Sequence, residues 1–287
     1  MRWVSGFRWS VLAILAVPLF ATAGPASEIA PLYRNTAAQV LPAGGYQSRI
    51  AIGDSIVKLA QAGVIDREKL EALYTEGGWA PEELKIILDQ TSRQPILLTA
   101  KNARLYVNLL WPLGLANRMA ANNNSPLNGP SRFRYASTGG WTLGREANGG
   151  AYFNKFPIVE LSPQQEALVT RVAETSFRSC CNNSTFYQDC NHGSALLGLL
   201  ALGASQGLNE EELYREALAF NAFWFPEHYT HIALYFKLVK GIDWRDVDAR
   251  TVLSADFSSA RGMQANVAKE LRTRGLLPGQ EGTDCSA

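Results

Sequence analysis

Residues 193–207 have the sequence GSALLGLLALGASQG, which is the clearest indication of the fold. It predicts a helix with leucine and alanine on every side, so that no face is left for water. A helix that is apolar all round lies inside a protein, and we expect this one at the centre of the core. Gly193, Gly198 and Gly203 would let neighbouring elements approach closely, and Gly207 is placed to end the helix.

Apolar residues recur at helical spacing in the segments that precede this stretch. The helices predicted from this spacing are residues 46–62, 66–77 and 81–88, and one that opens at Thr99 and is kinked or ended by Pro112. We find no alternation of apolar and polar residues clear enough to predict strands. The sequence therefore predicts a mainly α fold, a single multi-helix globular domain over residues 46–287, preceded by an extended segment over residues 24–45.

Residues 121–157 interrupt the helical pattern with a long, glycine-rich segment that we expect to be irregular. Loops of this length often bind ligands, and Arg134, Trp141 and Arg145 would suit an anionic or aromatic small molecule. The alternative is a loop that wraps the helical body and uses Trp141 and later aromatic residues as anchors. No glycine-rich phosphate-binding motif is present in it.

The first 23 residues have the layout of a secretory signal peptide. Arg2 and Arg8 are followed by an apolar run over residues 11–20 and by Ala-Thr-Ala at residues 21–23. The run is shorter than the roughly 20 residues that a membrane span needs, although an uncleaved anchor is the alternative. We therefore expect a periplasmic or secreted protein without a membrane span after cleavage.

The charge balance argues against nucleic-acid binding, and the size of the chain argues against cysteines that serve only to make it fold. The 27 basic residues are balanced by 26 acidic ones, which gives no basic face for nucleic acid. A chain of 287 residues, 47% of them hydrophobic, buries a large core, so its four cysteines are not needed simply to make it fold.

Three of those cysteines lie in residues 180–192, which have the sequence CCNNSTFYQDCNH. We expect one helix to end near Ser179 and to present Cys180 and Cys181, while Asn191 caps the central helix. A thiol at a helix N-terminus is stabilised as a thiolate by the helix dipole, so Cys190 is the predicted reactive or catalytic nucleophile.

Three kinds of chemistry fit this cluster. The first is a transition-metal site for zinc, copper or an iron–sulfur cluster, with Cys180, Cys181, Cys190 and a neutral His192 as ligands. The second is a redox-active or nucleophilic thiol site. The third is a structural disulfide from Cys190 to Cys180 or Cys181, with Cys285 paired to the remaining thiol or free.

A second cluster of ionisable residues comprises Glu227, His228 and His231. If a helix begins at Pro226, Glu227 and His231 share one face and could act as metal ligands or as an acid–base pair. The alternative is a polar helix start beside an aromatic core patch. The sequence as a whole predicts an exported helical protein that binds a transition metal or performs thiol-redox chemistry. The competing function is a non-catalytic extracytoplasmic binding protein with structural disulfides and an unknown small-molecule or metal ligand.

Overall fold

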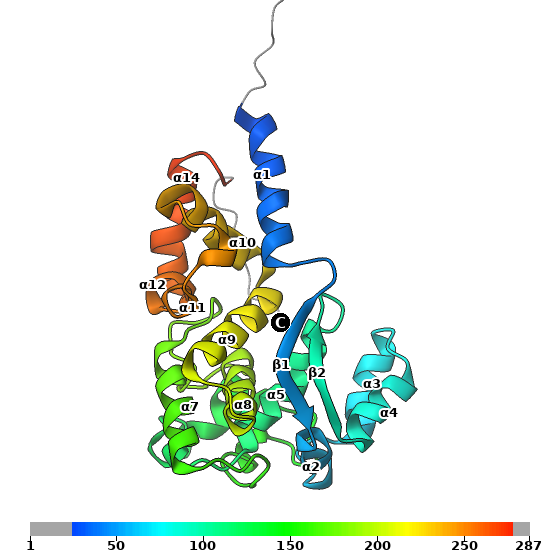
Figure 1. Ribbon diagram of the computed structural model, residues 1–287. Coiled ribbons are helices and arrows are strands. Elements are labelled where there is room, and N and C mark those ends of the chain that lie inside the picture. Colours follow the sequence, from blue (N-terminus) through cyan, green and yellow to red (C-terminus); the bar gives the residue numbers. More distant parts are fainter. Residues whose placement is uncertain (1–24, 278–287) are drawn as a thin grey trace, which may run out of the picture.

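Two buried helices, α5 (Ala103–Ala116) and α8 (Asn191–Ser205), pack together at the centre of the fold. The computed structural model describes residues 25–277 (Figure 1), so the predicted signal peptide and Cys285 lie outside the described residues. A Cβ atom on Gly114 would come within 1.8 Å of the Ser194 carbonyl oxygen, and one on Gly198 within 2.5 Å of the Leu110 carbonyl oxygen. The two backbones touch because both residues are glycine, which confirms the central helix and its close approach.

Two further helices lie beside α8, and each begins with a well-formed cap. In α7 (Pro163–Thr175) the cap is Ser162, paired with Gln165, and in α9 (Glu210–Trp224) it is Asn209, paired with Glu212. Both pairs form reciprocal hydrogen bonds that satisfy backbone N–H groups at the helix start. Helix α7 ends at Thr175, earlier than predicted, because the backbone at Ser176 is extended and its carbonyl accepts a hydrogen bond from the Thr185 N–H at 2.9 Å.

The predicted helix over residues 46–62 is wrong in its first half. Residues Tyr46–Gly53 form strand β1, which pairs antiparallel with β2 (Ser92–Leu98), and helix α2 covers only Ser55–Gln61. Along β1 the buried positions are Ser48, Ile50 and Ile52, which is the period of a strand. Gly53 then adopts a left-handed conformation, which separates the strand from the helix.

The remaining predictions for the first half hold more closely. Asp66 caps α3 (Arg67–Glu76), and α4 (Pro81–Asp89) has its proline in the first turn. Pro112 lies inside α5, which continues to Ala116. The glycine-rich segment is irregular, as predicted. It contains only short helical turns, at Ala120–Asn124, Pro130–Arg134, α6 (Ala136–Gly139) and Gly149–Ala151.

The N-terminal segment was expected to be extended, and this expectation is wrong. Residues Pro25–Val40 form helix α1, which packs against α10 (Pro226–Tyr235) (Figure 1). Shorter helical segments complete the C-terminal part around α10. They are Phe236–Lys240, Trp244–Asp246, α11 (Ala249–Val252), α12 (Ala255–Ser258), α13 (Ala260–Gly262), Met263–Ala268 and α14 (Lys269–Thr273).

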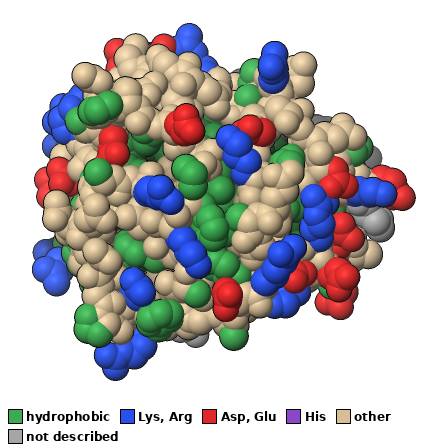
Figure 2. All heavy atoms as spheres, turned by 90° about the horizontal axis from the view of Figure 1, so that it is seen from below, with side chains coloured by type: hydrophobic (Ala, Val, Ile, Leu, Met, Phe, Trp, Pro, Cys, Tyr) green, Lys and Arg blue, Asp and Glu red, His purple; other side chains and the backbone are tan. Residues whose placement is uncertain are grey.

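The protein is mostly helical, with a small two-stranded sheet. Within residues 25–277, none of the helices combines the length and the apolar character needed to cross a membrane. Figure 2 shows the face at the α2 end, where lysines and arginines are mixed with acidic and hydrophobic side chains. The face shown therefore presents basic and acidic groups intermixed rather than a uniformly basic surface.

Candidate metal centre

The loop between α7 and α8 brings three cysteines together. It is held on one side by α7, where the Phe186 N–H donates to the Ala173 carbonyl at 3.0 Å. On the other side the Cys181 carbonyl accepts a hydrogen bond from the Ala260 N–H at 2.9 Å. The loop is thereby fixed between α7 and the C-terminal helices. Cys180 and Cys181 lie within this loop, five and six residues beyond the end of α7, and not at the end of that helix as we had predicted.

Cys190 itself caps α8, where Asn191 had been expected to do so. Its Sγ accepts a hydrogen bond from the Gly193 N–H at 3.4 Å, and Asn191 is the first residue of the helix. The sulfur atom therefore lies at the positive end of a buried helix, next to a backbone N–H group that has no partner within the helix.

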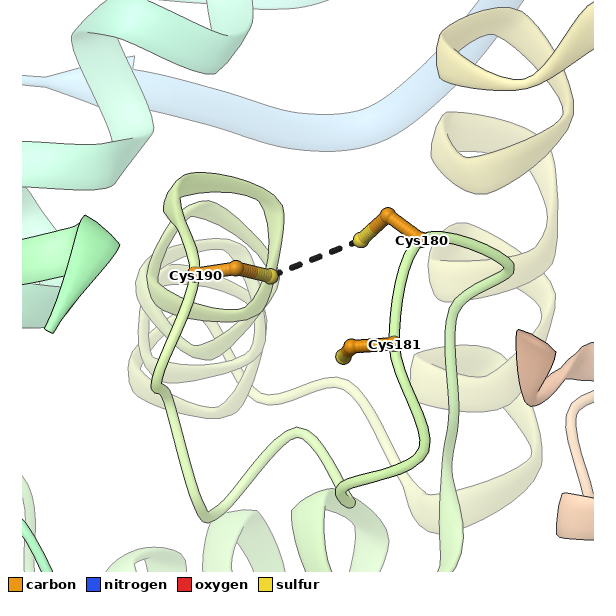
Figure 3. A group of neighbouring side chains, drawn as sticks. All are labelled: Cys180, Cys181 and Cys190. Atoms are coloured by element: carbon orange, nitrogen blue, oxygen red, sulfur yellow. Dashed lines mark hydrogen bonds between the residues drawn. The ribbon is translucent and has the colours of Figure 1, made fainter. Parts of the chain in front are cut away.

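The three sulfur atoms form a compact group. The Sγ atoms of Cys180 and Cys190 are 3.5 Å apart, and those of Cys180, Cys181 and Cys190 all lie within 4.8 Å of one another (Figure 3). Figure 3 shows Cys180 and Cys181 on one strand of the loop, with Cys190 opposite them at the start of α8. Among the described residues, no histidine, aspartate or glutamate joins this group. Three close cysteines can hold a metal ion.

A buried arginine, which the sequence analysis did not single out, organises the loop. The Arg178 side chain is fully buried, and its Nε–H donates to the Cys190 Sγ at 3.1 Å. Its terminal nitrogens donate to the carbonyl oxygens of Asn183 at 2.9 Å and Tyr187 at 3.3 Å, and to the Asp189 carboxylate at 2.6 Å. Buried charges require partners of this kind, and every nitrogen of the guanidinium has one.

The three thiols of the cluster differ in pKa. The pKa of Cys190 is lowered because the thiols of Cys180 and Cys181 donate hydrogen bonds to its sulfur and because Arg178 lies beside it. Hydrogen bonding to Cys181 and Cys190, together with burial, raises the pKa of Cys180. The pKa of Cys181 is raised to about 12. Cys190 is therefore the sulfur that ionises first, in line with its place at the helix start.

His192 follows Cys190 but is turned into an aromatic pocket. Its ring centroid is 4.5 Å from that of Phe225 and 5.8 Å from that of Trp224. Burial lowers the pKa of His192 to about 4, so its imidazole is neutral at pH 7. The predicted neutral form is therefore present, but His192 is not one of the residues that the structure groups around the sulfur atoms.

The second predicted cluster lies at the start of α10. The Glu227 carboxylate and the His231 Nε2 are 4.0 Å apart, and the His231 ring contacts Tyr33 of α1 edge-on. The His228 ring stacks on Phe225, the same residue that contacts His192. The fold thus brings two of the histidines to one aromatic ring. Within the part of the chain that the structure describes, none of these side chains belongs to a group of three potential metal ligands.

The three side chains proposed for a ligand loop have different surroundings. Trp141 is fully buried, donates from Nε1 to the Val64 carbonyl at 2.8 Å and packs edge-on against Trp111, so it anchors the loop to the core. Arg145 is exposed and covers Gly63. Arg134 is exposed, and its guanidinium donates to the Ser131 hydroxyl at 3.3 Å.

The glycine-rich segment contacts the cysteine loop through other residues. The Ser137 N–H donates to the Asp189 carbonyl at 3.1 Å, and the Tyr187 hydroxyl donates to the Tyr135 hydroxyl at 3.0 Å.

A sequence signal for the buried arginine did exist. Arg178 and Asp189 are the two charged residues of the segment 175–191, and their charges have opposite signs.

Comparisons with known proteins identify no relative. The chain matches no protein-family model, and neither a curated protein nor a solved structure matches it. The residues and their geometry are therefore the basis for the function proposed below.

Proposed function

We propose that this is an exported metal-binding protein in which Cys180, Cys181 and Cys190 hold one soft transition-metal ion. The observation that carries the proposal is that all three sulfur atoms lie within 4.8 Å of one another. Thiolates bound at about 2.3 Å to one ion are roughly 4 Å apart, so the spacing suits a single shared ion. Iron–sulfur clusters spread their cysteine ligands over several iron atoms, which this spacing favours less.

A structural disulfide explains less of the arrangement. A bond between Cys180 and Cys190 would account for two sulfur atoms and would leave Cys181 in the cluster without a role. A shared ion accounts for all three. Export is supported by the signal-like residues 1–23, and the role of Cys190 as a catalytic nucleophile stays a prediction.

One observation favours a second candidate function, thiol-redox chemistry. Cys180 and Cys190 are 3.5 Å apart, and Cys190 is the thiol that ionises first. In exchange with a low-molecular-weight disulfide, these two thiols would form one S–S bond, and the acceptor would leave as two thiols. Cys181 takes no part in that step.

Replacement of Cys181 by serine distinguishes the two candidates. In native mass spectrometry of the mature protein, purified without chelator, we expect one metal ion per chain with all three thiols reduced. Cys181→Ser should reduce metal affinity at least tenfold, since it removes one of three ligands. Ser184→Ala, in the same loop, is the matched control and should keep the metal.

The competing result is equally distinct. A metal-free protein that is lighter by two hydrogen atoms, and is unchanged in this respect by Cys181→Ser, would reject the metal site. It would leave a Cys180–Cys190 disulfide, and the ease of its reduction would then separate a redox pair from a structural bond.

A further inference from the structure

We infer that the ion is monovalent copper, Cu(I), bound by three sulfur atoms alone, with Arg178 as the buried cation beside the Cys190 sulfur. This inference rests on the proposed function and adds the identity and coordination of the metal. It follows from three observations. The site has three sulfur ligands, the neighbouring Asp189 and His192 side chains already make other contacts, and the buried Arg178 guanidinium lies beside Cys190.

The donor set consists of three soft ligands. Within residues 25–277, no histidine, aspartate or glutamate joins the three cysteines as a fourth ligand. Zinc in proteins is almost always four-coordinate, so a zinc ion here would have to recruit water. Cu(I) prefers soft thiolate ligands and tolerates low coordination numbers, and three converging sulfur atoms suit it without a further donor.

Two side chains close in sequence to Cys190 that could serve as a fourth ligand, Asp189 and His192, already make other contacts. Both oxygens of Asp189 accept hydrogen bonds, one from Arg178 at 2.6 Å and the other from the Asn183 amide at 2.7 Å. The His192 imidazole packs against the rings of Phe225 and Trp224. The Asp189 carboxylate also accepts a hydrogen bond from the Cys181 thiol at 3.9 Å, so it contacts a proposed ligand as a hydrogen-bond acceptor. The His192 ring would have to leave its aromatic contacts in order to reach the metal.

The buried guanidinium stabilises the negative charge of a three-thiolate site. Three thiolates around Cu(I) carry a net charge of −2, which a partly buried site cannot hold without a nearby cation. Arg178 places one positive charge in direct contact with the Cys190 sulfur and so offsets part of this charge. Its other hydrogen bonds, to the loop carbonyls and Asp189, hold it in this position. We therefore assign Arg178 as a positioning residue for the metal, not as a ligand.

Competition between metals tests the assignment. The reduced, full-length mature protein is equilibrated without oxygen with one equivalent of Cu(I), a tenfold excess of Zn(II) and a chromophoric Cu(I) chelator. We expect the protein to retain Cu(I), and X-ray absorption at the copper edge to show three sulfur neighbours. Ag(I), a soft monovalent ion that is stable in air, should bind with the same stoichiometry.

Variants of arginine test its role. Arg178→Lys keeps the charge but loses the donor that reaches Cys190, and should weaken Cu(I) binding by about 10- to 100-fold, as other changes next to metal ligands do. Arg171→Lys, at a largely exposed arginine of α7, is the matched control and should bind as the unchanged protein does. Equal Cu(I) affinity of Arg178→Lys and the unchanged protein would overturn the role of Arg178.

The outcomes separate the two levels of the proposal. If Zn(II) displaces Cu(I), or if the copper spectrum shows a nitrogen or oxygen neighbour, the assignment to three-coordinate Cu(I) fails while the metal site stands. If the protein retains neither ion, the proposed function fails as well. The metal competition with the unchanged protein decides the assignment even if Arg178→Lys does not fold.

Discussion

The position of Arg178 depends on the absence of a side chain at Gly193. A Cβ atom there would lie 2.5 Å from the Arg178 Cζ and Nη2 atoms and 2.7 Å from Nε. The guanidinium thus lies directly against the first turn of α8, between the helix backbone and the loop carbonyls that accept its hydrogen bonds. At the scale of single residues, a glycine creates the space that lets a buried cation reach the Cys190 sulfur.

Gly193→Ala should therefore destabilise the protein, although alanine is ordinarily the better helix former. We expect a loss of about 1–3 kcal/mol in the free energy of unfolding, because the new methyl group overpacks a buried site. We also expect weaker metal binding, because the guanidinium must move away from Cys190. Urea unfolding measures the first effect, and Gly44→Ala, where a Cβ atom would meet nothing within 4 Å, is the control. Stability equal to that of the unchanged protein would contradict this account.

At the scale of elements, strand β1 is attached to α9 by one buried carboxylate. Glu216 accepts hydrogen bonds from the Ser48 hydroxyl at 2.6 Å, the Arg49 N–H at 2.8 Å and the Tyr46 hydroxyl at 3.1 Å. All three donors lie in the first half of β1. Burial raises the pKa of Glu216, against the effect of these hydrogen bonds. The strand and the helix are thus joined by an acid that needs its donors.

Ser48→Ala should loosen this attachment. It removes the shortest of the three hydrogen bonds to Glu216 and leaves a buried carboxylate oxygen without that donor, at a cost of about 1–3 kcal/mol. Hydrogen exchange should show a loss of amide protection in β1 that exceeds the loss in α8. Ser92→Ala, on the exposed part of β2, is the matched control, and an equal effect of both substitutions would argue against the role of Glu216.

At the scale of the whole molecule, the histidines predict how stability depends on pH. The chain has three histidines, and burial lowers the pKa of each below 6.5: His192 to about 4, and His228 and His231 in the same direction. Because the unfolded chain binds protons at higher pH than the folded one, acid favours unfolding. Their contribution to stability is complete above pH 6.5 and is lost as the pH falls toward the folded pKa values.

Between pH 7.5 and pH 5.5 the metal-free, reduced protein should lose unfolding free energy, about 1 kcal/mol of it through His192, and His228 and His231 act in the same direction. Urea unfolding at the two pH values measures the loss. His231→Asn should make it smaller, since it removes one of the three groups that take up a proton on unfolding. A free energy of unfolding that stays constant over this range would contradict the prediction.

The amino-acid sequence alone predicts two central features of the protein, the buried helix and the cysteine cluster. The apolar stretch at residues 193–207 predicts a buried helix whatever surrounds it, because no face of it can meet water. The dense cysteines at residues 180–190 likewise predict a site, since their separation along the chain keeps them close in space. These predictions needed only local spacing and hydrophobicity.

Other features depend on contacts between residues that are far apart in the sequence. Residues 46–53 form a strand because Ile50 and Ile52 pack into the core and Glu216, from a distant helix, accepts hydrogen bonds from their neighbours. Trp141 belongs to the core because it donates to Val64 and packs on Trp111. The cysteines become a three-sulfur group around Arg178 because contacts from α7 and from the C-terminal helices fold their loop back onto the start of α8.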